Sequence, residues 1–140
     1  MKNSMKVAFP SNSDNERFAR NVAAAFILEL DPTLDELSEI KTAVSEAVTN
    51  SVIHGYCGVE GTVVMEGYID GDKVEFTITD TGAGIEDIEK AREPLYTGKP
   101  EMERSGMGFT IMETFMDEVT VKSAPGKGTS VKMSKRIKQV

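Results

Sequence analysis

The sequence predicts an α/β fold, a two-layer sandwich of helices on a mixed or antiparallel sheet. Two observations lead to this prediction. Apolar residues recur at helical spacing between about residues 16 and 54, and they alternate at strand spacing from Thr62 onward. Glycine-containing turns separate the alternating segments. The 140 residues contain no repeat, linker or low-complexity stretch, so we expect a single domain, 1–140.

The first half begins with a short edge strand, Met5–Phe9, which ends at Pro10. A helix is expected at about Glu16–Leu30, and Asp31-Pro32 ends it. Its apolar side consists of Phe18, Ala19, Val22, Ala23 and Phe26.

A second, longer helix is expected at about Leu34–His54. Thr33 and Glu36 have the spacing of a capping box at its start, and Gly55 suits its C-terminal end. The residues that we expect it to bury are Leu37, Ile40, Val44, Val48 and Val52.

The second half contains the remaining strands and two shorter helical segments. The expected strands are Thr62–Ile69, Lys73–Asp80, Glu118–Ser123 and Thr129–Ser134, with turns at Asp70-Gly71-Asp72 and Pro125–Gly128. The expected helices are a weak one near Glu86–Ala91 and a short one at Gly106–Met116, with the irregular stretch Glu93–Ser105 between them.

Composition excludes several classes of function. Lys and Arg total 16 against 23 Asp and Glu, a net charge of −7, which argues against direct nucleic-acid binding. One histidine and one cysteine cannot supply a zinc-finger or haem site. No apolar run approaches the ~18 residues of a membrane span, and the N-terminus has no signal core. We therefore expect a cytoplasmic protein.

Side-chain alternation places two polar groups on the buried face of the sheet. Asp80 shares the parity of Phe76 and Ile78, and Thr129 shares that of Val131. Each alone is best interpreted as a strand-end residue bonded to nearby backbone. Together they are suited to the polar floor of a ligand pocket.

Glu46, Asn50 and His54 form one stripe on the second helix, at spacing i, i+4, i+8. The stripe borders the apolar face, where polar groups are costly unless they have partners. A partly solvated helix edge explains it equally well, since such stripes are common.

Three glycine-containing segments complete the pattern. Gly82 and Gly84 follow the strand that ends at Asp80, and Gly106-Met107-Gly108 opens a helix whose free N–H groups suit an anionic phosphate. The third segment, Gly126–Thr129, alone reads as a hairpin turn. None fits a P-loop or a Rossmann fingerprint, so those folds are rejected.

Taken in order, these segments resemble the ATP site of the GHKL superfamily, which has the Bergerat fold. The matching motifs are Glu46-x-x-x-Asn50, Asp80-x-Gly82-x-Gly84, Gly106-x-Gly108 and Gly128-Thr129. The whole chain, including S-E-A-V-T-N-S-V-I-H-G-Y and R-S-G-M-G-F-T-I-M, resembles the serine-kinase anti-sigma factors of that superfamily.

The resemblance implies a nucleotide-binding role for a defined set of residues. Asp80 would accept a hydrogen bond from the adenine amino group, assisted by Thr129, and Asn50 would hold Mg²⁺ through its amide oxygen. The other residues that would contact ATP or ADP are Gly82, Gly84, Ser105, Gly106, Met107 and Gly108.

The same resemblance makes the segment Glu93–Ser105 a lid over the nucleotide. Lys99, Arg104 and Ser105 are its candidates for phosphate contact, against the alternative of a solvated loop.

Glu46 would be the general base that takes the proton of an attacking hydroxyl. Glu46 could also activate water, so it does not distinguish a kinase from an ATPase. The chain has no room for the further domains of gyrase-type or chaperone ATPases. His54, the only histidine, lies in the nucleotide-binding helix, so the phosphate acceptor is expected on another protein.

The implied function is an anti-sigma factor and ATP-dependent protein-serine kinase. It would bind and inhibit a sporulation sigma factor and phosphorylate its anti-anti-sigma antagonist on serine, and the bound nucleotide would select between these partners. Two alternatives remain open: a nucleotide-gated binding module without phosphoryl transfer, and an interaction domain that binds no nucleotide and uses its glycines only as turns.

Two surfaces are candidates for protein contacts. Arg20, on the outward side of the first helix with Arg17 and Leu28, is expected to contact a partner. Val64 and Tyr68 lie on the outer face of their strand, which a second copy of the chain would cover in a homodimer.

Overall fold

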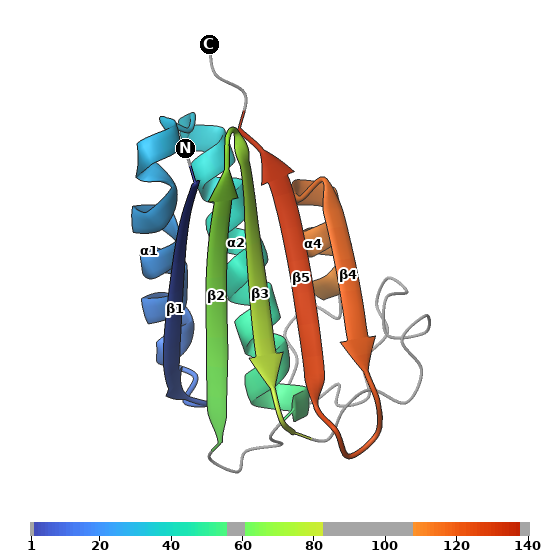
Figure 1. The fold of residues 1–140 in the computed structure, drawn as a ribbon. Helices are drawn as coiled ribbons and strands as arrows, with labels where there is room; N and C mark the ends of the chain where they lie inside the picture. Colours follow the sequence, from blue (N-terminus) through green and yellow to red (C-terminus); the bar gives the residue numbers. More distant parts are fainter. Residues whose placement is uncertain (1, 56–60, 83–107, 138–140) are drawn as a thin grey trace.

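The structure, a computed structural model, describes residues 2–55, 61–82 and 108–137, without the side chains of residues 54 and 55. Its strands are β1 (Lys2–Pro10), β2 (Thr62–Asp70), β3 (Lys73–Asp80), β4 (Glu118–Ser123) and β5 (Thr129–Arg136). Its helices are α1 (Asn15–Ile27), α2 (Leu34–Asn50) and α4 (Gly108–Phe115), and a 3₁₀ turn (Leu28–Leu30) and a π-helical turn (Ser51–Gly55) extend the first two (Figure 1).

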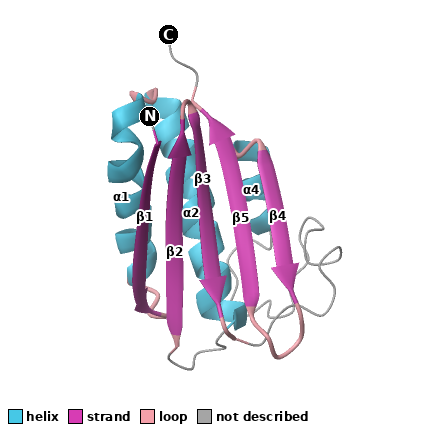
Figure 2. Ribbon diagram, in the orientation of Figure 1, coloured by secondary structure: helices cyan, strands magenta, loops and turns pink. Residues whose placement is uncertain are grey.

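The strands form one sheet in the order β1-β2-β3-β5-β4, and every neighbouring pair is antiparallel. The helices of the described ranges all cover one face of this sheet, and none of them lies on the other, which we call the open face (Figure 2). The predicted two-layer α/β sandwich is therefore confirmed, and the sheet is antiparallel where the sequence left mixed pairing open. Because β5 lies between β3 and β4, residues far apart in the sequence meet at the ends of these three strands.

The core lies between the sheet and the helices, where the predicted parity holds. Phe76, Ile78 and Val131 are almost completely buried, and Asp80 and Thr129 share their face of the sheet. On α2, the fully buried residues are Ile40, Ala43, Val44, Ala47 and Val48. The predicted Leu37 and Val52 are partly buried at the edge of this cluster.

A glycine lets α1 approach the sheet closely. At Gly67 a Cβ atom would lie 2.8 Å from the ring of Phe26, which is closer than carbon atoms can pack. The Phe26 ring in turn meets Phe76 edge to face, with ring centroids 6.1 Å apart. The helix thereby packs closely against β1 and β2, and its Phe26 ring reaches β3.

The start of α2 is fixed by the predicted capping box. The Glu36 N–H donates to the Thr33 hydroxyl at 3.1 Å, and the Thr33 N–H donates to the Glu36 carboxylate at 2.9 Å. These two hydrogen bonds satisfy the backbone N–H groups of Thr33 and Glu36 at the start of the helix.

Both long helices end differently from the prediction. The helix expected at Glu16–Leu30 leaves α geometry after Ile27, and Asp31 then takes a left-handed φ of 49°. The helix expected at Leu34–His54 ends at Asn50 and continues as the π-helical turn. β-branched Val52 and Ile53 favour the α-helix less than the preceding residues do, which fits the change at that point.

The placement of Phe18 in the core was wrong. Its side chain is 47% exposed, while Ile27, which the sequence reading left out, is fully buried. Phe18 instead packs edge to face against Phe9, with centroids 5.9 Å apart. Phe9 belongs to β1, the edge strand, so none of the described strands covers the outer side of this pair.

Several strand and helix ends extend or shift. β1 covers Lys2–Pro10 because its first residues pair with the end of β2, and β5 continues to Arg136 beside the start of β3. β3 and β4 have the predicted bounds. Of the helix expected at Gly106–Met116, Gly108–Phe115 is observed. The predicted helix Glu86–Ala91 and the irregular stretch Glu93–Ser105 lie outside the described residues.

Candidate functional site

Three polar side chains lie in one row across the ends of three strands. Asp80 of β3 is paired with Thr129 of β5, and Thr129 is paired on its other side with Ser123 of β4. All three have the parity of the core residues on their strands and so face the helices. Asp80 is 3% exposed and Thr129 is 5% exposed. We call Asp80, Thr129 and Ser123 the inner row.

The Asp80 carboxylate has one satisfied and one unsatisfied oxygen. Its Oδ1 accepts a hydrogen bond from the Gly82 N–H at 3.0 Å, which fixes the orientation of the group. Its Oδ2 is buried and has no hydrogen-bond partner within the part of the chain that the structure describes. A buried carboxylate oxygen without a donor is costly, so this atom is suited to accept from a ligand. An exocyclic amino group of a purine fits that need.

The turn between β4 and β5 packs against the backbone that follows Asp80. Gly128 has a φ of +83°, and a Cβ atom there would lie 2.1 Å from the Asp80 carbonyl oxygen. Only glycine combines this conformation with this close approach. Gly128 is therefore more than a hairpin residue, because its small size lets the turn approach the backbone of Asp80 and Thr81. A cavity of about 260 Å³ lies at this end of the sheet, and residues of both faces and of the turn line it: Thr79, Asp80, Lys122, Ser123, Ala124, Lys127, Gly128, Thr129 and Ser130.

The C-terminal end of α2 reaches the same end of the sheet. Glu46 and Asn50 are half-buried and lie one turn apart, and Asn50 is the last α-helical residue. The π-helical turn that follows contacts β3, and Figure 1 shows it beside the end of that strand, where Asp80 is located. The topology therefore carries the Glu46–Asn50 edge and the inner row to one end of the molecule. A π-helical turn at this position is typical of functional sites.

The remaining predicted nucleotide contacts are described only in part. Gly82 and Gly108 are half-buried, and Gly108 begins α4, which packs beside α2. The predictions for Gly84, Ser105, Gly106 and Met107, for the lid 93–105 with Lys99 and Arg104, and for the His54 side chain lie outside the described residues.

Within the described ranges, no three or more His, Cys, Asp and Glu side chains gather around a common point where they could hold a metal ion. None of the helices in those ranges is long and apolar enough to cross a membrane.

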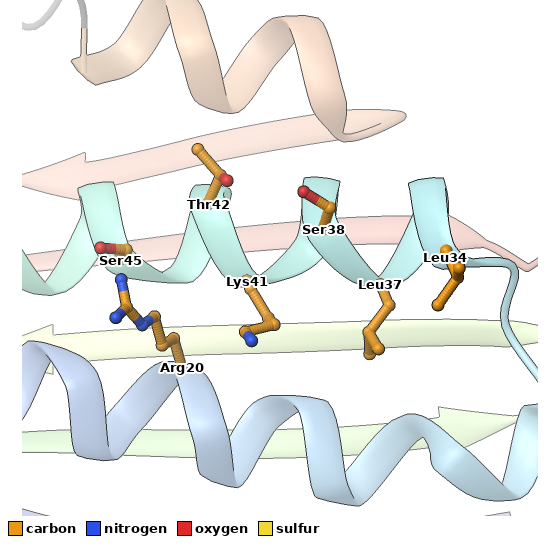
Figure 3. Close-up of a pocket in the computed structure, with 7 residues that line it drawn as sticks. All are labelled: Arg20, Leu34, Leu37, Ser38, Lys41, Thr42 and Ser45. Carbon is orange, nitrogen blue, oxygen red and sulfur yellow. The ribbon is translucent and has the colours of Figure 1, made fainter.

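Arg20 lies on a different surface from the inner row. Its guanidinium pairs with Glu16 one turn earlier on α1, at 3.2 Å, and Glu16 also accepts from Ser45 of α2. Figure 3 shows Arg20 beside Ser45, across a groove of about 340 Å³ between α1 and α2. The groove is lined by Arg20, Leu34, Leu37, Ser38, Lys41, Thr42 and Ser45.

Comparison with known proteins agrees with the ATP-site motifs. The pattern of the histidine kinase-like ATPase domain matches residues 9–135. An anti-sigma F factor of Oceanobacillus iheyensis is 62% identical over 138 residues, 98% of this chain and 94% of that protein. Anti-sigma F factors of a Thermoanaerobacter species and of Clostridium perfringens are each 56% identical, over 96% and 98% of this chain and 94% and 99% of theirs. The chain belongs to the anti-sigma F factor family.

The fold of the anti-sigma F factor family also has a solved counterpart. A crystal structure of the RsbU and RsbW domains of a Mycobacterium tuberculosis protein superimposes with a TM-score of 0.72 at 18% identity. The match covers 99% of this chain and 33% of that one, and it shows the shared fold. The relatives at 56–62% identity confirm the resemblance to the anti-sigma factors, and the ATPase domain of this family binds nucleotide.

The sequence reading missed one residue of the site. Ser123 shares the parity of Val119 and Val121, so strand alternation places it on the inner face. The alternation in the sequence therefore predicts that Ser123 faces inward. It does not predict that Ser123 lies beside Thr129, because that pairing depends on the strand order.

Proposed function

We propose that this protein is an ATP-dependent protein-serine kinase of sporulation that binds and inhibits a sigma factor. Its protein substrate is the anti-anti-sigma antagonist, which it phosphorylates on serine. Family membership supports the anti-sigma role. The observation that carries the nucleotide site is the buried Oδ2 of Asp80 beside Thr129, which has no hydrogen-bond partner among the described residues and lies at the end of the sheet that α2 also reaches.

The nucleotide base is held by the inner row. Asp80 accepts from the adenine amino group through Oδ2, while Gly82 holds Oδ1, and Thr129 assists. Because the other carboxylate oxygen is already engaged, the orientation of Oδ2 is set before ATP binds, and less ordering is required on binding. Gly82 and Gly84 let the base approach the backbone after β3.

The triphosphate extends from the base toward the ends of α2 and α4. Asn50 would supply an amide oxygen to Mg²⁺, an ion that takes few protein ligands and is otherwise held by phosphates and water. Ser105, Gly106, Met107 and Gly108 contact the phosphates at the start of a helix, where N–H groups favour an anion. The segment 93–105 closes over the nucleotide.

Glu46 acts as the general base for transfer. Its carboxylate takes the proton of the attacking serine hydroxyl as the serine oxygen bonds to the γ-phosphorus. The bond from that phosphorus to the β–γ bridging oxygen breaks, ADP leaves, and phosphoserine remains on the antagonist. Glu46 lies one turn before Asn50 on α2, which supports a base beside the residue that would hold the metal.

Two surfaces serve the protein partners. Arg20 and Lys41 give the α1–α2 groove a positive lining beside the exposed Leu34, so it suits a partner that presents carboxylates next to apolar groups. The open face of the sheet carries Tyr68, which is 43% exposed, and the half-buried Val64, and we propose that a second copy covers it in a homodimer. The homodimer and its two partners, the sigma factor and the antagonist, are located in the cytoplasm in this proposal.

The decisive test is Glu46→Gln, with Glu29→Gln, an exposed carboxylate on the turn after α1, as the matched control. Each variant is mixed with Mg²⁺, γ-labelled ATP and the purified antagonist protein, and label on serine is measured. The rate of labelling should fall by about 10²- to 10⁴-fold in Glu46→Gln and stay unchanged in Glu29→Gln.

ATP-induced thermal stabilisation is measured in parallel and should persist in both variants, because Glu46 does not hold the base. Release of phosphate without labelled protein would show an ATPase instead. Nucleotide-dependent partner binding with no labelling by the unmodified chain would show a nucleotide-gated binding module.

A further inference from the structure

The hydroxyl of Ser123 is bonded in a way that fixes the hydrogen of its neighbour. Ser123 Oγ donates to the carbonyl oxygen of Gly128 at 2.9 Å, because a carbonyl can only accept. A serine hydroxyl has one hydrogen, so this bond uses it. Ser123 Oγ also lies 2.8 Å from Thr129 Oγ1, and in that contact Thr129 is therefore the donor. The Thr129 hydrogen points away from the ligand side of the row.

This chain of bonds leaves the inner row with acceptors only. The Thr129 oxygen keeps its lone pairs, while the Asp80 carboxylate contributes Oδ2, an acceptor that no group in the described ranges engages. Two acceptors on paired residues of neighbouring strands match an amino group, which has two hydrogens to give. The same two acceptors disfavour an oxo group. That group would bring a third acceptor to the same place, so buried oxygens would be left without a hydrogen-bond donor.

We infer that Ser123 is a positioning residue that makes the site select 6-amino purines over 6-oxo purines, by holding the Thr129 hydroxyl as an acceptor. The inference rests on the proposed nucleotide site at Asp80 and Thr129. Without Ser123 the Thr129 hydroxyl rotates and can donate to a 6-oxo group. A site that hydrogen-bonds a polar ligand group discriminates strongly against an analogue that lacks it, so the effect of a single serine is measurable.

The test compares ATP with inosine triphosphate, which carries an oxo group in place of the amino group at position 6. Dissociation constants of both are measured by calorimetric titration on the full chain and on Ser123→Ala. We expect the unmodified chain to prefer ATP, and Ser123→Ala to reduce this preference about tenfold, the value of one ordinary hydrogen bond. Since both nucleotides are measured on the same variant, a loss of folded protein cancels in the ratio.

Two controls separate positioning from a structural effect. Ser123→Thr keeps the hydroxyl and should retain the preference for ATP. Ser130→Ala removes a hydroxyl one residue along β5 from Thr129, on the opposite face, where it lies 3.4 Å from Thr79, and should also retain it. In a Thr129→Val background, Ser123→Ala should change the ratio no further, because its effect passes through Thr129.

The outcomes distinguish this inference from the function on which it rests. If the unmodified chain prefers ATP and Asp80→Asn weakens ATP binding, but Ser123→Ala leaves the ATP-to-inosine-triphosphate ratio intact, the role of Ser123 is overturned and the nucleotide site stands. If Asp80→Asn binds ATP as tightly as the unmodified chain, the nucleotide site is overturned, and the inference with it.

Discussion

Two adjacent rows of polar residues cross the same end of the sheet, one on each face. The inner row, Asp80, Thr129 and Ser123, faces the helices. The outer row consists of Thr79, Ser130 and Lys122, paired in the same register one residue away. In the inner row the hydroxyls of Thr129 and Ser123 are 2.8 Å apart, whereas those of Thr79 and Ser130 in the outer row are 3.4 Å apart.

The two rows have similar side chains but different access to water. Lys122 is exposed and Thr79 and Ser130 are half-buried, so water can satisfy the polar groups of the outer row. Asp80 and Thr129 are almost fully buried, and Asp80 Oδ2 has no hydrogen-bond partner among the described residues. A group bound in the site therefore has to supply the donor for this oxygen. Burial, set by strand parity, is what distinguishes the two rows, and it supports the inner row as the proposed binding site.

We expect the largest effect from Gly128→Ala, because the added methyl group does not fit between the β4–β5 turn and the backbone of Asp80. The added Cβ would lie 2.1 Å from the Asp80 carbonyl oxygen at a φ of +83°, so the turn or β3 has to move. We expect a loss of more than about 4 kcal/mol in the free energy of unfolding, measured by urea denaturation.

Gly126→Ala is the matched control for this substitution, two residues earlier in the same turn. Its φ is +75° and nothing lies within 4 Å of the added Cβ, so only the backbone conformation is penalised, by about 1–2 kcal/mol. Equal losses in the two variants would show that the contact with Asp80 does not stabilise the fold.

The next largest effect is expected from Asp80→Asn, measured as ATP affinity by calorimetry. The amide can still accept from the Gly82 N–H, but it places an NH₂ donor where the buried Oδ2 accepts. A hydrogen bond to a charged group is worth about 1.5–3 kcal/mol, so affinity should fall about 10- to 100-fold.

Without nucleotide, the melting temperature of Asp80→Asn should not decrease, because the substitution removes a buried charged oxygen that has no partner in the described residues. Thr79→Val, the neighbour of Asp80 in the outer row, should change ATP affinity less than twofold. A comparable loss in both variants would mean that the two rows do not differ in function.

The alternation of apolar residues was sufficient to predict the strands that carry the site. It gave the bounds of β3 and the inward orientation of Asp80 and Thr129, because strand periodicity is a local property. It could not predict that Ser123 lies beside Thr129, since that pairing depends on the insertion of β5 between β3 and β4. A contact that depends on strand order is not encoded in any one segment.

Helix ends were predicted less well than strands, for a related reason. The apolar spacing of α2 continues past Asn50 through Val52, so periodicity alone predicts one uninterrupted helix to His54. The change to a π-helical turn at Ser51 depends on small differences in backbone preference and on packing against β3. The lid 93–105 and its roles stay predictions, as they lie outside the described residues.

The smallest effect concerns two lysines of β5 on opposite faces of the sheet. Lys135, 13% exposed, pairs with Glu39 of α2 at 3.1 Å and donates to the Phe115 carbonyl oxygen at the end of α4 at 2.8 Å. Lys132, 56% exposed, pairs only across the open face with Glu75, at 2.8 Å, among the interactions that the structure gives for it.

Lys135→Met should therefore cost about 1–2 kcal/mol in urea denaturation, because it leaves a helix-end carbonyl and a carboxylate without their donor. Lys132→Met should cost less than about 0.5 kcal/mol, as is typical of an exposed ion pair, and its loss should shrink further in 1 M salt. If Lys132→Met were the more destabilising variant, the open face would contribute more to the folded state than the helical face. The contrast between the rows would then reflect something other than burial.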